Sequence, residues 1–243
     1  MRNVISVAII ALAVVVSAYL LSDAFRNRNR NDDTISVTGL GSKDFVSDLI
    51  VWRGSFSKKS YVLKDAYAAL DSDRAIIKNY LSSKGVGEQE VVFSAVQISK
   101  DYQYQYDDNG NMRQQIFSGF TLTQNVQIES KEVDKLEKIS REVTELINSG
   151  VEFYSYPPEY YYTKLAELKI EMIAEATKDA HNRAKSIAEN ANSGLGDLKK
   201  SDLGVFQIIA QNSSEDYSWG GSFNTAAKKK TANVTVKLVY MVD

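Results

Sequence analysis

The sequence has no cysteine, a single histidine and only two prolines, which stand together at Pro157 and Pro158. Without cysteine the chain cannot form disulfide bonds, thiolate nucleophiles, cysteine-ligated metal sites or a lipid anchor on cysteine. An excess of either charge is also missing, because 29 basic and 31 acidic side chains give a net charge of −2. The chain as a whole lacks the positive charge that binding to nucleic acid requires, so we expect no nucleic-acid partner.

Residues that could carry catalysis are sparse as well. The one histidine, His181, is expected on a helix, where a surface or hydrogen-bonded structural role is favoured over a Ser-His-acid triad. Gly39 and Gly41 lack the third glycine of a phosphate-binding loop and precede a strand. We therefore predict no catalytic, cofactor-binding or metal-binding residue and no cofactor, and we expect that the protein is not an enzyme. The alternative is a carboxylate-based hydrolase of envelope material whose site no pattern identifies.

Two charged clusters have simpler interpretations than a site. Glu167, Glu171 and Glu175 share one helical face at i, i+4 spacing and could converge on a metal ion. A solvated acidic face with ion pairs to Lys164 and Lys178 is the favoured interpretation. The basic run 228–230 is interpreted as solvated lysines that protect an edge strand from pairing.

The start of the chain does contain a long apolar run. Residues 4–21 read VISVAIIALAVVVSAYLL, without a charge, and their number is close to the lower limit for crossing a bilayer. Residues 1–24 are predicted to be a membrane anchor or a signal segment, and residues 25–33 a polar, flexible tether. A retained anchor is favoured because the run continues past Val16-Ser17-Ala18, which resembles a cleavage site. A cleaved signal peptide is the alternative.

After Thr34, segments of alternating hydrophobicity are interspersed with segments of helical periodicity. Helices are predicted over residues 62–81, 133–147 and 162–192, and a hairpin over residues 96–128. Further strands are predicted at residues 35–37, 49–56, 151–156, 203–210 and 231–242. Gly39 and Gly41 are expected in the turn after the first strand. This order predicts one α+β domain, residues 34–243, with helices packed on one face of a mainly antiparallel sheet, an arrangement that two βαββ modules would produce.

Tyrosine is abundant and clustered, with 14 residues in the chain. One group alternates along the first hairpin strand, and the other crowds one connection; together they are Tyr102, Tyr104, Tyr106, Tyr154, Tyr156, Tyr160, Tyr161 and Tyr162. Tyrosine offers a large amphipathic area at low entropic cost and is enriched in interfaces. These eight residues are therefore the candidate interface. The alternative is that they cover the edge of the domain's own core.

Several segments, in order, resemble the SIMPL-domain family, which includes a periplasmic immunogenic antigen and oxidative-stress defence proteins. The segment 35–41 is similar to the family's I-x-V-x-G-x-G start, and Asp48 matches an aspartate before the second strand, with Ser47 in place of the usual proline. The alanines from Ala176 to Ala188 resemble an Ala-rich helix of the family, whereas residues 151–162 depart from its pattern. The resemblance implies an exported protein, often a ring-like oligomer, with no established catalytic residue.

The resemblance and the charges around the apolar run indicate opposite orientations. Arg26, Arg28 and Arg30 follow the run, so the count of basic residues would keep the C-terminal side in the cytoplasm. We give more weight to the resemblance and predict a domain on the periplasmic side of the cytoplasmic membrane, or free in the periplasm if the segment is cleaved. The predicted function is that of a membrane-tethered, non-enzymatic scaffold or binding module of the cell envelope, active in stress defence and assembled as a homo-oligomer.

Overall fold

The computed structural model describes residues 12–22, 33–108, 110–214 and 217–242. After Asp33 the described chain forms the α-helices α2 (Leu63–Ser83), α3 (Val133–Glu142) and α4 (Leu165–Asn190). The strands are β1 (Thr34–Val46), β2 (Leu49–Ser60), β3 (Val91–Phe93), β4 (Gln97–Tyr106), β5 (Met112–Ser130), β6 (Phe153–Ser155), β7 (Glu159–Tyr161), β8 (Leu195–Leu203), β9 (Gln207–Ala210), β10 (Ser222–Phe223) and β11 (Lys229–Val242). The α+β fold class agrees with the prediction.

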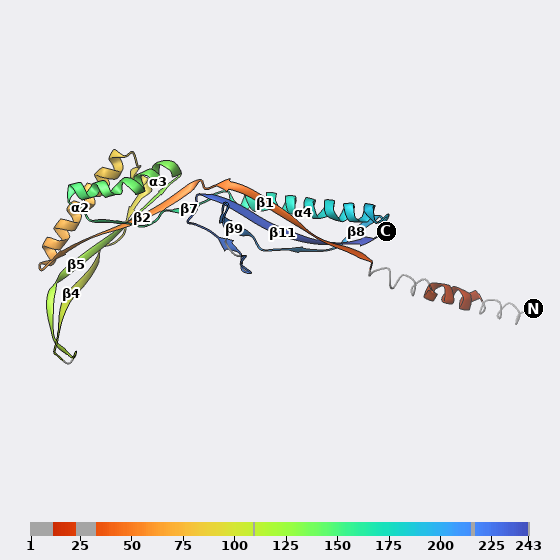
Figure 1. The fold of residues 1–243 in the computed structure, drawn as a ribbon, viewed down its shortest axis with the longest axis horizontal. Coiled ribbons are helices and arrows are strands. Elements are labelled where there is room, and N and C mark those ends of the chain that lie inside the picture. The colour runs from red at the N-terminus through yellow and green to blue at the C-terminus, as the bar shows by residue number, and fades with distance from the viewer. Residues whose placement is uncertain (1–11, 23–32, 109, 215–216, 243) are drawn as a thin grey trace, which may run out of the picture.

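These strands form two sheets, where the sequence predicted one. The first sheet has the order β1-β11-β9-β10, with β8 also pairing β11; the second has the order β3-β5-β2-β6, with β4 on β5 and β7 on β2. Figure 1 shows the sheets end to end, with α4 over the first and α2 and α3 over the second. Each sheet has its own buried core. The division arises where the chain leaves β1 at Val46 and enters β2 at Leu49.

The two sheets share one topology. In the second sheet β2 is followed by α2, the short strand β3, β4 and β5, and β5 lies between β2 and β4. In the first sheet β1 is followed, after an insertion, by α4, β8 and β11, and β11 lies between β1 and β8. Both are βαββ modules whose last strand is central, and the second sheet is inserted between the first strand and the helix of the other module. All pairs are antiparallel except β9 with β10.

Gly39 and Gly41 lie inside β1 and not in a turn, which corrects the prediction from sequence. A Cβ atom on Gly39 would stand 2.2 Å from the Ala176 carbonyl oxygen, and one on Gly41 would stand 2.4 Å from that of Met172. The helix α4 is therefore in contact with the backbone of β1. Its side of the contact is the predicted small-residue stripe, because Ala176, Ala180 and Ala184 are fully buried. Glycine under alanine is what allows this helix and strand to approach so closely.

The core of the second sheet is built from larger side chains. Trp52 and Phe56 of β2 are fully buried beneath Leu70 and Ile77 of α2. The predicted helix 133–147 is α-helical only to Glu142 and continues as a 3₁₀ helix, Val143–Ser149, which ends at Gly150 with a φ of 77°. A left-handed residue at this position is the usual glycine stop of a helix.

The N-terminal prediction falls largely on residues that the structure does not describe. Of the segment 1–24, residues 12–22 are described, and they are helical and exposed. Of the tether 25–33, Asp33 alone is described. In the part of the chain that the structure covers, no helix has both the length and the hydrophobicity needed to span a membrane.

Candidate interaction surface: the β4–β5 ribbon

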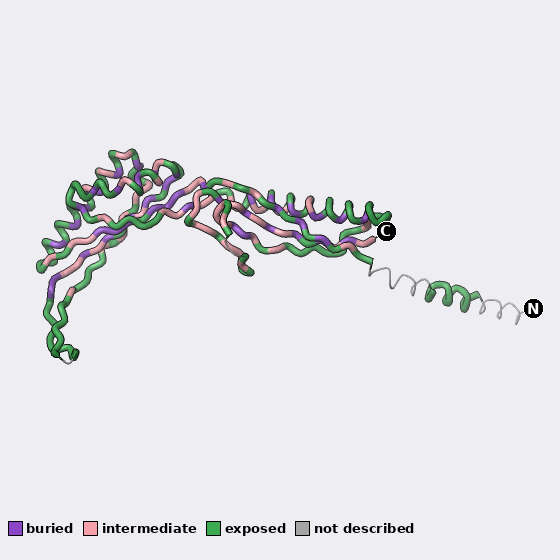
Figure 2. Tube along the Cα trace, viewed as in Figure 1, coloured by how far each residue is buried: buried purple, intermediate pink, exposed green. Residues whose placement is uncertain are grey.

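The hairpin β4–β5 is longer than the sheet that carries it. β5 pairs with β2 from Ser130 back to Phe120, where β2 ends at Ser60. Beyond that point β5 pairs only with β4, from Gly119 opposite Asp101 to Met112 opposite Tyr106. We call residues 101–119 the ribbon. Figure 1 shows it projecting from the second sheet, away from α2 and α3, and Figure 2 shows that most of its described residues are exposed.

The three tyrosines of β4 form one face of the ribbon, as their spacing predicted. Tyr102 stands opposite Phe117, Tyr104 opposite Gln115, and Tyr106 opposite Met112, and residues directly opposite in an antiparallel pair share a face. The register shifts between Asp101 and Tyr102, so the ribbon begins at a β-bulge. Bulges increase the local twist of a strand, which explains why the ribbon turns away from the sheet.

This face continues the core of the second sheet outwards. Phe120 packs against the buried core, and its ring is 5.1 Å from that of Phe117. The Phe117 ring in turn meets Tyr102 at 5.9 Å and Tyr61, which precedes α2, at 6.4 Å. Aromatic rings at such distances stabilise one another edge to face. A line of rings therefore leads from the core to the ribbon and supports its base.

Towards the tip, the same face has no cover in the part of the chain that the structure describes. The exposed fractions are 51% for Tyr104, 63% for Tyr106 and 60% for Met112. An isolated two-stranded ribbon is only marginally stable in water, and contiguous exposed apolar side chains are typical of binding surfaces. Sequence reasoning identified the tyrosines but missed Phe117 and Met112. The feature that points to them is the length of β5. The strand has 19 residues, and only Phe120–Ser130 pair with β2 in the sheet.

The second tyrosine cluster is divided between the core and the surface. Tyr160 is 7% exposed and belongs to the core of the second sheet, while Tyr162 packs on Phe45 with ring centres 4.8 Å apart. Tyr161 donates a hydrogen bond to Glu159 over 3.0 Å. Tyr154 and Tyr156 alone in this cluster are exposed. The alternative interpretation, tyrosines that cover the domain's own core, fits Tyr160 and Tyr162.

The connection that carries Tyr160–Tyr162 joins the two sheets. The Asp48 carboxylate, between β1 and β2, accepts hydrogen bonds of 2.7 Å from both the backbone N–H and the hydroxyl of Thr163. The Asp48 N–H donates to the Tyr161 carbonyl, and the Ser47 N–H donates to the Lys228 carbonyl. The aspartate that the resemblance singled out is therefore a structural residue of this junction.

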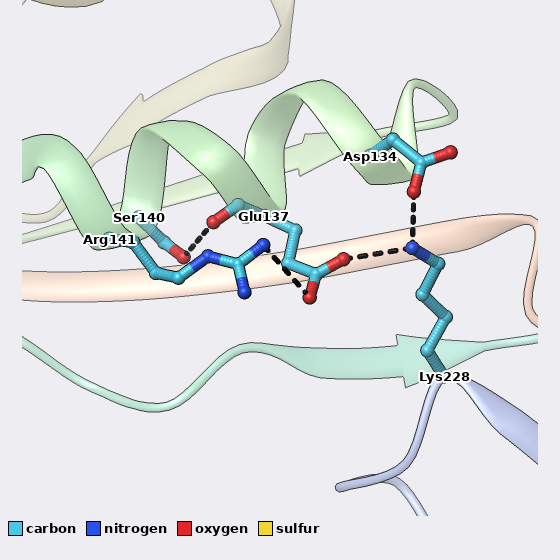
Figure 3. Close-up of polar contacts among 5 residues, drawn as sticks. All are labelled: Asp134, Glu137, Ser140, Arg141 and Lys228. Atoms are coloured by element: carbon cyan, nitrogen blue, oxygen red, sulfur yellow. Dashed lines mark hydrogen bonds and ion pairs between the residues drawn. The ribbon is translucent and has the colours of Figure 1, made fainter.

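The basic run 228–230 is part of the same junction and does not protect a sheet edge, because β11 is a central strand. In Figure 3, Lys228 reaches from the start of β11 to α3, where it pairs with Asp134 and, at 2.9 Å, with Glu137. Glu137 also accepts from Arg141 at 3.2 Å. The hydrogen bond to Asp134, followed by that to Glu137, raises the pKa of Lys228 above its usual value. Lys228 thus ties the helix of one sheet to the central strand of the other.

Lys230 is buried, with 1% of its surface exposed. Its ammonium group donates to the Tyr160 carbonyl at 2.5 Å and lies 5.5 Å from the centre of the Phe223 ring. Burial lowers the pKa of Lys230 to about 8. Because burial gives Lys230 a lower pKa in the folded protein than in the unfolded chain, this residue makes stability depend on pH.

The remaining candidate groups have structural partners. His181 Nδ1 is 3.0 Å from the Tyr240 hydroxyl, in agreement with a hydrogen-bonded structural role. Glu171 pairs with Lys43 of β1 at 2.5 Å, and not with Lys164 or Lys178. Among the described residues, no group of three or more acidic or histidine side chains is arranged to hold a metal ion.

A surface hollow of about 540 Å³ contains three glutamates and is relevant to the hydrolase alternative. Glu90 accepts a hydrogen bond from the Gly87 N–H at 2.7 Å, and Glu132 pairs with Lys135 at 2.8 Å. The third, Glu129, lies on β5. Because two of the three carboxylates are already engaged, the hollow presents no clear acid–base pair, and the hydrolase alternative gains no specific residues from it.

A sequence model of the SIMPL family, described as a protein of unknown function (DUF541), matches residues 35–240. The chain belongs to the SIMPL family. No curated protein matches the sequence. The SIMPL match spans both sheets and the helices α2, α3 and α4, from Ile35 in β1 to Tyr240 in β11. The description of the SIMPL family names no activity.

Proposed function

We propose that this SIMPL protein is an exported, membrane-tethered and non-enzymatic protein of the cell envelope that acts as an oligomeric scaffold or binding module. The observation that carries the proposal is the ribbon, whose aromatic face extends beyond the core and remains exposed. Exposed tyrosines on a preformed strand lose little entropy on binding. Stress defence is the setting that the family resemblance suggests for such a module.

The shape of the domain supports a role for the ribbon at a distance from the membrane. Figure 1 places the start of β1 and the tip of the ribbon at opposite ends of the molecule. If the chain is anchored through residues 1–24, the ribbon would therefore lie at the end of the domain that is remote from the membrane. Contacts made by the ribbon would then link anchored copies to one another or to other envelope components.

The tyrosine face is tested by replacing Tyr102, Tyr104 and Tyr106 together with serine. We expect self-association of the full-length chain to weaken at least about tenfold, because aromatic residues dominate the binding energy of interfaces. Sedimentation over a concentration series measures the effect. The matched control replaces Tyr154 and Tyr156, which are also exposed but lie outside the ribbon. Association that survives the ribbon variant and fails in the control would contradict the proposal.

The location is tested separately with reporters fused after Asp243. We expect activity from a reporter that works only outside the cytoplasm, such as alkaline phosphatase, in cells that produce the full-length chain. Activity of a reporter that works only in the cytoplasm would contradict the proposed location. It would instead agree with the orientation that Arg26, Arg28 and Arg30 indicate.

A further inference from the structure

β4 is an edge strand along its whole length. Within the described part of the chain its one strand partner is β5, so the opposite edge presents unpaired backbone groups. Proteins usually protect such edges with proline, several charges or a covering element. The outer segment of β4, Tyr102–Tyr106, has none of these protections and reads Tyr-Gln-Tyr-Gln-Tyr.

The edge strand of the first sheet, β1, is in contact with a helix. There the Leu40 N–H donates a hydrogen bond of 2.9 Å to Asp179 of α4, and the helix lies directly against Gly39 and Gly41. Lys43 of β1 is also paired with Glu171 of the same helix. One edge strand thus has a helix packed against it and a backbone N–H bound to a carboxylate of that helix, while β4 is left open to a further strand.

We propose that the outer edge of β4 pairs with the same edge of a second copy of this chain, antiparallel about a two-fold axis at Gln103. The inference deepens the proposed oligomer by naming the contact, and it rests on that proposal. A two-fold contact uses one patch twice, so the patch has to be complementary to itself. Strand addition supplies the backbone hydrogen bonds, and the side chains set the register.

The side chains of β4 favour this register. With Gln103 on the axis, Tyr102 stands opposite the partner's Tyr104, and Lys100 stands opposite the partner's Tyr106. Aromatic cross-strand pairs and an ammonium group over a tyrosine ring are both favourable. With the axis at Tyr104 instead, tyrosines would also face each other, but Asp101 would face the partner's Asp107. Asp101 is already paired with Lys59 at 2.8 Å, so a second carboxylate opposite it would compete for that lysine and add like-charge repulsion. The favoured register joins the two exposed tyrosine faces into one aromatic surface.

The absence of cysteine allows a direct test, because a single introduced cysteine is the only thiol in the full-length chain. Gln103→Cys places two thiols opposite each other across the axis, within the limit of about 7 Å between Cα atoms for a disulfide. The matched control is Gln114→Cys, since Gln114 is exposed on the neighbouring strand opposite Gln105. In the proposed pair the two Gln114 positions are about 20 Å apart, from the strand spacing and rise.

After mild oxidation in membranes, we expect disulfide-linked dimers of the Gln103→Cys protein at least ten times as abundant as those of the Gln114→Cys protein. Tyr104→Lys, combined with Gln103→Cys, should reduce the yield at least tenfold, because it places two ammonium groups beside the contact. Two results would overturn the β4 contact without contradicting the oligomer. In the first, the copies associate in sedimentation but do not cross-link through position 103; in the second, they cross-link equally through position 114. A chain that sediments as a monomer would overturn both the contact and the oligomer.

Discussion

Replacing Gly39 with alanine should lower the free energy of unfolding of the full-length chain by about 3 kcal/mol. The added methyl group would meet the Ala176 carbonyl oxygen at 2.2 Å and the Ala180 backbone nitrogen at 2.4 Å. Both are backbone atoms of α4, so no side-chain rotation can relieve the contact, and the helix would have to move away from β1. Urea unfolding followed by circular dichroism measures the loss.

Gly220→Ala is the matched control for this prediction, because a Cβ atom at Gly220 would have no neighbour within 4 Å. A change within about 0.5 kcal/mol is expected there, as for most surface substitutions. A Gly39→Ala protein as stable as the wild type would mean that α4 does not lie against the glycines of β1. The close packing of the first sheet would then be wrong.

Replacing Lys230 with methionine should change how stability depends on pH. Burial holds the pKa of Lys230 at about 8 in the folded protein, against 10.5 for an ordinary lysine in the unfolded chain. Between these values the unfolded chain binds more protons, so the wild type gains stability as the pH rises from 8 to 10.5. Below pH 8 the group is charged in both states, and the cost of burying the charge is fully present.

The difference between the two pKa values corresponds to about 3 kcal/mol. We therefore expect the stability of Lys230→Met, relative to the wild type, to be highest near pH 7 and to fall by about that amount by pH 10.5. Urea unfolding at a series of pH values measures it. Lys229→Met, at the exposed neighbouring residue, should show no such trend. A constant difference between Lys230→Met and the wild type would contradict a buried ammonium group in the folded state.

The helices and the hairpin were predictable because each has a strong local pattern. Helix α4 was placed by its alanine stripe, and the hairpin by alternation on both sides of a turn around Asn109 and Gly110. The second tyrosine group was not predictable in the same way. Tyr160 and Tyr161 follow the two prolines in a short strand, β7, and their burial depends on the junction between the sheets.

Other features depended on contacts between distant segments. Strand β8 was largely missed because its sequence, LGDLKKSDL, has no regular alternation of apolar and polar residues. An edge strand can lack this alternation because its pairing with β11 holds it in the sheet. Gly39 and Gly41 were mistaken for a turn because only the packing of α4 shows why glycine is needed inside a strand. The lysines at 228–230 were assigned to the solvent because nothing local shows that β11 is central.

The central claim is that the ribbon mediates association between copies of this SIMPL protein. The most direct test is the molar mass of the wild-type full-length chain, measured by sedimentation in a mild detergent whose contribution is removed by density matching. We predict a mass that rises with concentration from one chain to a defined multiple of it. A mass equal to one chain at every concentration would contradict the account.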